Sequence, residues 1–317
     1  MTVYRNKQID TAKGILMLLV ILGHVLLASS NLTQTGSFLL KLIYSFHMPA
    51  FLIISGILFD REKQKKNVFQ KFLLTRVKHI LIPYFIFELL GGIAQNVFAY
   101  GSRETFFTIL IRIMTFRMYV GADWYLLTYL LAIVLVYIAN KVIQKNSGLL
   151  MTAGTLFVTV SIYQGTIINE QCVFILRILL AYSLIIFGIL MKDILLSFDQ
   201  KKIVIAGVCF ILSVVYNTNV FMHAVILGNP VLFLLGGVSG SYLVLQLAAV
   251  IDSNLMNTLG RYSIVSMGIH QDMIWIFGWF FGLNGSSPLI IFNIAVTYLL
   301  CIIVTMIYRS IFGKEQL

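Results

Sequence analysis

A chain of 317 residues that is 59% hydrophobic and only 11% charged cannot cover the surface of a soluble protein, since soluble domains are roughly a quarter charged. The composition excludes a soluble enzyme and predicts an all-α fold, a polytopic bundle of membrane helices. The net charge of +11 does not indicate nucleic-acid binding, because the basic run is short and lacks the interleaved aromatic residues of such a groove.

Ten segments are apolar enough to be spanning helices, which need about 20 residues, although the fifth and seventh are short. In chain order they are residues 14–29, 38–59, 79–99, 122–139, 149–163, 171–191, 203–217, 231–251, 262–281 and 289–308. The first has no small-residue cleavage site after it and is expected to be retained. Residues 103–119 mix three arginines with Phe and Ile, which predicts an interfacial amphipathic helix. We expect residues 1–317 to form a single integral membrane domain with no fused soluble domain.

The lysines and arginines give an independent check on the number of spans. Of the 23, 18 fall in the two termini and the four loops that share their side of a ten-span protein, and three fall in the opposite loops. Cytoplasmic loops carry an excess of Lys and Arg. The alternation therefore favours about ten spans with the N- and C-termini in the cytoplasm.

Seven of these cationic residues lie between the second and third predicted spans. They are Arg61, Lys63, Lys65, Lys66, Lys71, Arg76 and Lys78. Such a run is typical of topological retention and of attraction to anionic lipid headgroups. A docking surface for a phosphorylated cytoplasmic ligand is the alternative interpretation, and the sequence leaves both open.

Ionisable side chains at membrane depth are functional candidates, because burying them in hydrocarbon is unfavourable. At a rise of about 1.5 Å per residue, His24 lies about 15 Å inside the first span and His47 about 14 Å inside the second. Glu88 in the third span and His270 in the ninth lie about 14 and 12 Å deep. Several helices thus bring protonatable groups to a similar depth, as a buried polar chamber requires. The other two histidines fall near the membrane faces and are interpreted as interface residues: His79 and His223.

The first predicted helix has its own internal pattern. Lys13 and His24 are eleven residues apart, close to three helical turns, and share a stripe about 16 Å long. Lys13 is expected at the cytoplasmic mouth, held by Asp10 one turn earlier. Gly23 leaves space beside His24 for a ligand or a neighbouring helix. The alternative is a snorkelling lysine at a helix end with a structural histidine.

Several sequence blocks follow one another along the chain. They are Arg5 to Gly14 with Leu22–Gly23–His24, then Phe46–His47–Met48–Pro49–Ala50–Phe51, Arg76 with Ile82–Pro83–Tyr84, Trp124–Tyr125–Leu126, and Leu259–Gly260–Arg261–Tyr262–Ser263 with Ile269–His270. In this order, from residue 5 to about 272, they resemble the acyltransferase-3 family of integral membrane enzymes, and more closely its fucose 4-O-acetylase-like branch.

The resemblance has three departures. Lys13 stands where the broader family usually has Arg, and a lysine cannot grip a phosphate in the bidentate way of an arginine. The second basic residue expected after Arg76 is either Lys78 or His79. Tyr125 replaces the common Phe.

The resemblance implies a membrane-embedded O-acyltransferase of about ten spans in the bacterial plasma (inner) membrane. It would move an acyl group, by family default acetyl, from cytoplasmic acyl-CoA to a sugar hydroxyl of a cell-surface polysaccharide or its lipid-linked precursor. The expected partners are acyl-CoA, the glycan or lipid-linked acceptor and membrane lipids, with polysaccharide-biosynthesis proteins or a second copy of the chain as further candidates. No permanently bound cofactor is expected, with acetyl-CoA as co-substrate. The cysteines form no CxxC pair, and no metal is expected.

We expect the catalytic residues on the first helix. His24 is the general base on the acceptor hydroxyl or a transient acyl carrier, and the sequence leaves both roles open. Lys13 and Asp10 complete the catalytic set, with Lys13 near the CoA phosphates. Glu88 is a further candidate base.

The substrate-binding residues are expected on other segments. Arg76 and Lys78 would bind the CoA phosphates, and His47 and His270 would orient the acceptor or stabilise the oxyanion. Trp124 would stack on a sugar face, or alternatively belong to an interfacial aromatic belt.

Two alternatives of other classes stay open. A transporter of a glycan or lipid-linked precursor fits midplane charges and glycine-rich helices such as that containing Gly236, Gly237 and Gly240. A structural or assembly subunit would tolerate His24→Ala. Consumption of acyl-CoA separates the enzyme from both, because neither alternative cleaves a thioester.

Overall fold

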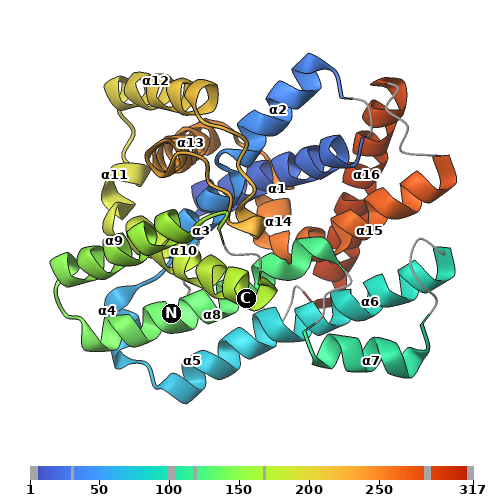
Figure 1. Cartoon of the computed structure of the whole chain (residues 1–317), viewed down its shortest axis with the longest axis horizontal. Helices are drawn as coiled ribbons and strands as arrows, with labels where there is room; N and C mark the ends of the chain where they lie inside the picture. The colour runs from blue at the N-terminus through green and yellow to red at the C-terminus, as the bar shows by residue number, and fades with distance from the viewer. Residues whose placement is uncertain are drawn as a thin grey trace. The chain divides into compact units, whose positions relative to one another are not determined.

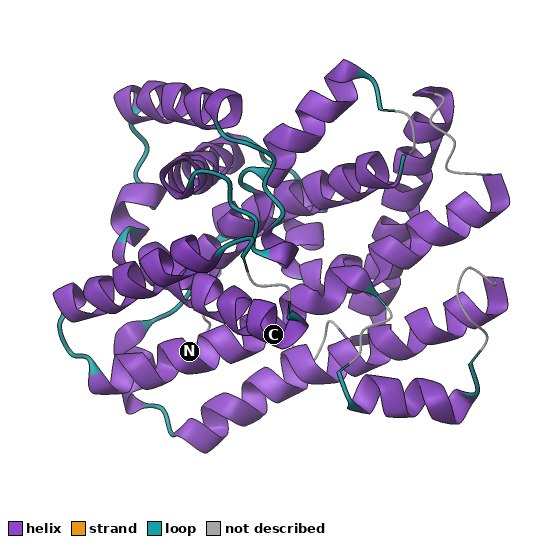
Figure 2. Cartoon of the chain, viewed as in Figure 1, coloured by secondary structure: helices purple, strands orange, loops and turns teal. Residues whose placement is uncertain are grey.

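The computed structural model describes residues 6–29, 32–98, 104–116, 120–166, 169–281 and 287–312. The regular elements in these ranges are helices, as the composition predicts, and the β pairing seen there is an isolated bridge between Phe221 and Ile226 (Figure 2). The chain divides into two compact units, which are described separately. The first comprises Met1–Leu40, His79–Trp124 and Ile251–Leu317, and the second comprises Lys41–Lys78 and Tyr125–Val250.

The first unit is organised around its N-terminal helix. Its helices are α1 (Lys7–Ala28), α6 (Ile82–Phe98), α7 (Phe106–Met114), the short η2 (Gly121–Asp123), α14 (Asn254–Arg261), α15 (Ser263–Phe281) and α16 (Ser287–Phe312). Helix α1 packs against α14, α15 and α16, and α15 packs in turn against α6 and α16 (Figure 1). The Asn6 side chain caps α1 by accepting hydrogen bonds from the backbone N–H groups of Gln8 and Ile9. This cap starts the helix two turns before the predicted span, so Asp10 and Lys13 are helical.

Two glycines let α14 lie directly against α1. A Cβ atom on Gly14 would collide with the Met256 carbonyl, and one on Gly260 would collide with the Asp10 carbonyl. The backbones therefore meet without intervening side chains, which fixes α14 beside the Asp10–Lys13 turn.

Helix α7 lies within the stretch predicted to be interfacial. Its Ile109 and Ile113 pack on Phe85 and Leu89 of α6. Its other face is apolar and exposed, with Phe106, Phe107, Leu110, Ile111 and Met114. The start and end of the predicted segment, residue 103 and residues 117–119, lie outside the described residues.

The second unit is built around α3, which packs against both α10 and α13. Its helices are α3 (His47–Ile57), α4 (Arg61–Lys66), α5 (Phe69–Arg76), α8 (Trp124–Val142), α9 (Asn146–Tyr163), α10 (Glu170–Leu190), α11 (Lys192–Leu196), α12 (Gln200–Tyr216), η3 (Met222–Ala224) and α13 (Pro230–Val250). Helix α10 packs against α3 and α9, and α13 packs against α12, α3 and α11 (Figure 1). Close approach of α3 and α10 depends on Gly56 and Gly188, where a Cβ atom would strike the carbonyls of Ile185 and Ile53.

The second predicted span is broken, which corrects the expectation of one continuous helix over residues 38–59. Helix α2 (Gln34–Tyr44) ends at Tyr44 and α3 begins at His47. Pro49 explains the break, because its ring lacks an N–H and clashes with the carbonyl four residues earlier, that of Ser45. Two carbonyl oxygens beside the break interact with side chains. The Ser45 hydroxyl donates to Leu42 O at 2.7 Å, and Nδ1 of the His47 ring lies 2.7 Å from Ile43 O.

The third predicted span begins earlier than expected. Helix α5, a π-helical turn η1 (Val77–Leu81) and α6 form one helical stretch of 30 residues, Phe69–Phe98. Arg76 and Lys78 therefore lie on a helix and not in the loop that the sequence predicted. Pro83 accounts for this irregularity in the same way. Its nitrogen cannot donate the helical hydrogen bond, and its ring crowds the turn before it.

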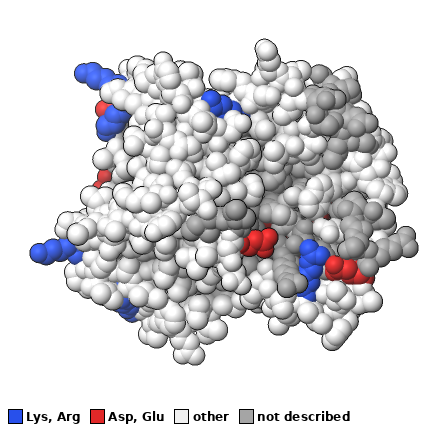
Figure 3. All heavy atoms as spheres, in the orientation of Figure 1, with Lys and Arg blue, Asp and Glu red and all other residues white. Residues whose placement is uncertain are grey.

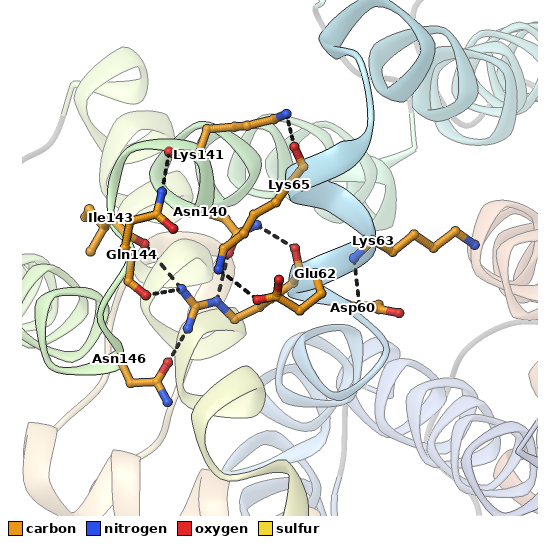
Figure 4. Close-up of polar contacts among 10 residues, drawn as sticks. Asp60, Glu62, Lys63, Lys65, Asn140, Lys141, Ile143, Gln144 and Asn146 are labelled. Carbon is orange, nitrogen blue, oxygen red and sulfur yellow. Dashed lines mark hydrogen bonds and ion pairs between the residues drawn. The ribbon is translucent and has the colours of Figure 1, made fainter.

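A hydrogen-bond network ties α4 to the loop between α8 and α9. The Arg61 guanidinium donates to Asn140 Oδ1 at 2.8 Å, to Asn146 Oδ1, and to the carbonyls of Ile143 and Gln144, both at 3.2 Å. Figure 4 shows these partners together with Lys65, which donates to Glu62 at 2.8 Å. That ammonium holds the pKa of Glu62 below its usual range, first by the hydrogen bond and then by its charge. In the same view the side chain of Lys63 extends away from the network.

Seven helical stretches of the described residues are long and apolar enough to cross a membrane. They are Lys7–Ala28, Gln34–Ile57, Phe69–Phe98, Gly121–Val142, Glu170–Leu190, Pro230–Val250 and Pro288–Ser310. The other three predicted spans are also helical, as α9, α12 and α15, but α12 has only 17 residues and α9 and α15 are richer in polar side chains. Uncharged residues make up most of the face in Figure 3, as expected for a multi-pass membrane protein.

Candidate active site

The predicted contact between Asp10 and Lys13 is present at the start of α1. Lys13 Nζ lies 2.8 Å from Asp10 Oδ1, and the side chains are only 17% and 7% exposed. The pair is held at this position by α14, through the glycine contacts described above. An ion pair so shielded is screened less by salt than one on an open surface.

Arg261 is a cation at the same end of α1 that the sequence analysis did not single out. It ends α14 directly after Gly260, which touches the Asp10 backbone. Its buried Nε has no hydrogen-bond partner, and its guanidinium carbon lies 5.6 Å from the centre of the Tyr262 ring. The sequence did point to Arg261, because it is the charged residue of the block from Leu259 to Ser263.

The structure brings two of the predicted histidines together. The rings of His24 on α1 and His270 on α15 lie edge to face, with centroids 5.0 Å apart. His24 is half-buried and His270 is fully buried. Their separation in sequence is 246 residues, so only the packing of α15 on α1 makes this pair.

The hydrogen bonds of His270 define its tautomer. Its Nδ1 lies 3.0 and 2.8 Å from the carbonyl oxygens of Ser266 and Met267, and carbonyls only accept, so Nδ1 carries a proton. In the neutral ring Nε2 then has a free lone pair, and this buried atom has no hydrogen-bond partner. His270 is thus arranged to accept a hydrogen bond, which suits the orienting role better than oxyanion stabilisation.

Three buried carboxyl groups from different elements lie in the same unit as the histidine pair. They are Glu88 on α6, Asp123 on η2 and Asp272 on α15. Asp123 interacts electrostatically with both other residues, and Glu88 Oε1 accepts a hydrogen bond from the Val120 N–H at 3.3 Å. Of the three, only Glu88 was expected from its depth in a predicted span. Asp272 lay in a predicted span two residues beyond His270, and this was a usable signal.

Trp124 follows Asp123 and begins α8. Its side chain is 8% exposed, so it is a buried residue. The turn before it is held to α15, since the Ala122 N–H donates to Gln271 Oε1. An aromatic side chain in such a position can pack against a sugar face only if that sugar enters the protein.

His47, Arg76 and Lys78 lie in the second unit. His47 is 3% exposed, and its Nδ1 donates to Ile43 O, so its Nε2 is an acceptor in the neutral ring. Tyr44 lies against it, with ring centroids 4.9 Å apart. The Arg76 guanidinium lies 5.1 Å from the centre of the Phe72 ring, one helical turn away, and Lys78 belongs to the π-helical turn.

No group of three or more metal-ligating side chains with the spacing of a metal site occurs in the part of the chain that the structure describes.

Comparison with known protein families shows which family the chain matches. A family model of the acyltransferase-3 type, described as an acyltransferase domain, matches residues 6–308 and so covers nearly the whole chain. No curated protein and no solved structure shows a significant match.

Proposed function

We propose, from the premise that this chain belongs to the acyltransferase-3 family and is a membrane acyltransferase, that it transfers acetyl from acetyl-CoA to a sugar hydroxyl. The acceptor would be a cell-surface polysaccharide or its lipid-linked precursor, in a bacterial plasma membrane. The contact between His24 and His270 is the observation that best supports this activity, because it joins two of the predicted site residues across the fold.

The chemical step assigns the proton transfers to His24. Its imidazole takes the proton of the acceptor hydroxyl while that oxygen attacks the thioester carbonyl. A C–O bond forms, the C–S bond breaks, and the imidazolium gives its proton to the departing CoA thiolate. His270 orients the imidazole or the hydroxyl through its free Nε2, and no net proton is taken up or released.

The donor phosphates are assigned to the cations at the start of α1. Asp10 holds Lys13 in place, and Arg261 adds a guanidinium, whose fork matches a phosphate better than an ammonium does. His24 lies about 16 Å further along α1, a distance that the long pantetheine arm of CoA can cover. Arg76 and Lys78 remain candidates for phosphate binding on the basis of their charge, and His47 and Trp124 remain candidates for the acceptor.

The test uses the purified protein in nanodiscs with radiolabelled acetyl-CoA and a panel of membrane glycans. We expect label transfer to a glycan, and a loss of at least about 100-fold in His24→Ala with CoA binding and the unfolding temperature preserved. Equal transfer by His24→Ala would refute the role of His24.

A transporter remains the second candidate, and the broken helix α2–α3 is the observation in its favour, since transporters bind substrates at such breaks. It predicts glycan flux without thioester loss in the same nanodisc preparation. Thioester loss in step with glycan labelling excludes it.

A further inference from the structure

Apart from Asp10, which holds Lys13, the described residues of the first unit contain three buried carboxyl groups that are not used in the chemical step. Glu88 and Asp123 are 0% exposed and Asp272 is 5% exposed. They come from three separate elements, α6, η2 and α15. Packing of α6 on α15 places Asp272 against Gly91 of α6, where a Cβ atom would lie 3.4 Å from both Asp272 carboxyl oxygens, and Asp123 lies within electrostatic range of both other carboxyl groups.

The two aspartates have carboxyl oxygens whose hydrogen-bonding capacity is unused. Both carboxyl oxygens of Asp123 and Oδ1 of Asp272 are buried without a hydrogen-bond partner. Among the described residues, no Lys or Arg forms an ion pair with either aspartate. Buried polar groups are nearly always satisfied, so these three oxygens are candidates to bind a ligand that donates hydrogen bonds.

Tyr84 provides an independent observation at the same place. It is 0% exposed, its hydroxyl has no hydrogen-bond partner, and it lies one turn before Glu88 on α6. Its electrostatic neighbours are Glu88 and Asp123, so the hydroxyl lies within range of two of the carboxyl groups. The set therefore offers several acceptors and one hydroxyl that both donates and accepts.

The side chains of Glu88, Asp123, Asp272 and Tyr84 indicate which kind of ligand they could bind. A metal ion is disfavoured, because the described residues contain no group of three ligating side chains that could hold one. A sugar fits, because its neighbouring hydroxyls donate to carboxyl oxygens and accept from a tyrosine. Trp124 directly follows Asp123 in the chain and is the nearest aromatic residue in sequence that could pack against such a sugar.

We propose that Glu88, Asp123, Asp272 and Tyr84 form a hydroxyl-binding subsite that recognises the glycan acceptor. This inference rests on the proposed function and extends it to the acceptor. His270 and Asp272 are two residues apart on α15, which directs them to different faces at the same level of the helix. The subsite therefore binds a part of the glycan other than the reacting hydroxyl, and it sets acceptor affinity rather than the rate of the chemical step.

The experiment measures acceptor and donor parameters separately in Asp123→Asn, Asp272→Asn and Tyr84→Phe, with the exposed Asp193→Asn as the matched control. The probes are methyl hexosides, methyl 6-deoxyhexosides and glycerol, each titrated against tryptophan fluorescence and assayed as acceptors of radiolabelled acetyl-CoA. We expect the acceptor KM and the glycoside Kd to rise about tenfold in both asparagine variants and about threefold in Tyr84→Phe. The KM for acetyl-CoA and the unfolding temperature should stay as in Asp193→Asn.

The two proposals fail in distinguishable ways. If the wild-type protein consumes no acetyl-CoA, the proposed function fails, and the fluorescence titration still decides whether the carboxyl groups bind glycosides. If no glycoside binds the wild-type protein, or if the asparagine variants bind glycosides as it does, the subsite is refuted. A variant that loses donor and acceptor affinity together indicates a structural role and also refutes it. Tyr84→Phe removes a single oxygen atom and gives the same comparison if an asparagine variant does not fold.

Discussion

His270 is the residue whose surroundings say most about its role. Both carbonyls near its Nδ1 lie one turn back on its own helix, so the ring is fixed in one tautomer by local geometry alone. Nε2 is then the atom free to act toward His24 or a hydroxyl. A structural histidine in a helix bundle would be expected to use both nitrogens.

Asparagine and glutamine separate the two nitrogens of His270. His270→Asn keeps a donor near Nδ1 and removes the Nε2 acceptor, whereas His270→Gln places an amide oxygen near Nε2. We expect kcat to fall about tenfold or more in His270→Asn and less in His270→Gln, with the KM for acetyl-CoA unchanged in both. Equal kcat values for the two variants would show that the Nε2 position is not used.

Arg261 can be tested through the phosphates of the donor. Removing its guanidinium in Arg261→Ala should raise the KM for acetyl-CoA about tenfold, since a hydrogen bond to a charged group contributes about 1.5–3 kcal/mol. Acetyl-pantetheine lacks these phosphates, so its KM should be the same in the variant and the wild type. An equal rise with both donors would mean that the substitution disturbs the fold of α14 instead.

His223, between α12 and α13, gives a prediction for pH. Partial burial and then the positive charge of Arg177 lower its pKa below the usual 6.5, so the folded state favours the neutral ring. The associated stability is complete above pH 6.5 and decreases as the pH falls below that value. Because much of this side chain still reaches solvent, the effect on the unfolding temperature should be small, at most about 2 °C between pH 7.5 and pH 5. His223→Gln should flatten this part of the profile, and an unchanged slope would refute the assignment.

At the scale of helices, the contact of α3 with α10 depends on two glycines. Gly56→Ala and Gly188→Ala should each destabilise the protein by about 1–3 kcal/mol, because the added methyl groups meet backbone atoms that cannot rotate away. Gly154→Ala and Gly207→Ala are matched controls, since a Cβ atom at those positions has nothing within 4 Å. They should be neutral or slightly stabilising, by up to about 1 kcal/mol, in thermal unfolding. Destabilisation of all four alike would point to general helix effects.

The helices were predictable from the sequence, and their irregularities were less so. Long apolar runs dictate helices because a backbone in lipid must satisfy its own hydrogen bonds. The break before His47 was also readable, since Pro49 removes a bond from the turn before it. The π-helical turn at Val77–Leu81 was not readable, because a wide turn depends on packing as much as on Pro83.

The candidate site was predictable in part. Counting residues along each helix placed His24 and His270 at a similar depth. Their contact also depends on which faces of α1 and α15 meet, and a residue count does not give that. The burial of Asp123 could not be predicted from the sequence, because Asp123 lies at the edge of a predicted span, where charged residues are common. Its burial follows from the fold around η2, on which the sequence pattern carries no information.

For the molecule as a whole, the number of spans is the open prediction. Seven helical stretches qualify by length and composition, and ten with both termini cytoplasmic follow from the charge pattern. Two of the three remaining helices can be tested by pairs of single cysteines in a chain whose native cysteines are replaced. The pair for α9 is Lys145→Cys and Gln164→Cys, and the pair for α12 is Lys201→Cys and Thr218→Cys.

We expect a membrane-impermeant maleimide to label Gln164→Cys and Thr218→Cys in intact cells, and the two lysine replacements only after permeabilisation. Labelling of both members of a pair from one side would mean that the helix between them does not cross, and the count would fall accordingly. Lys63→Cys, on the segment with most cations, is expected to be labelled only after permeabilisation as well.

The wide turn at Val77–Leu81 has a consequence for the angular register of the long helical stretch Phe69–Phe98. One extra residue in a turn offsets everything before it by about 100° relative to everything after it. A helical wheel drawn with a uniform step of about 100° therefore does not hold through this turn, and the faces of α5 and α6 have to be assigned separately. Deletion of one residue here should restore a uniform α-helical step, and the resulting change in activity would measure what the wide turn contributes, separately from the charges around it.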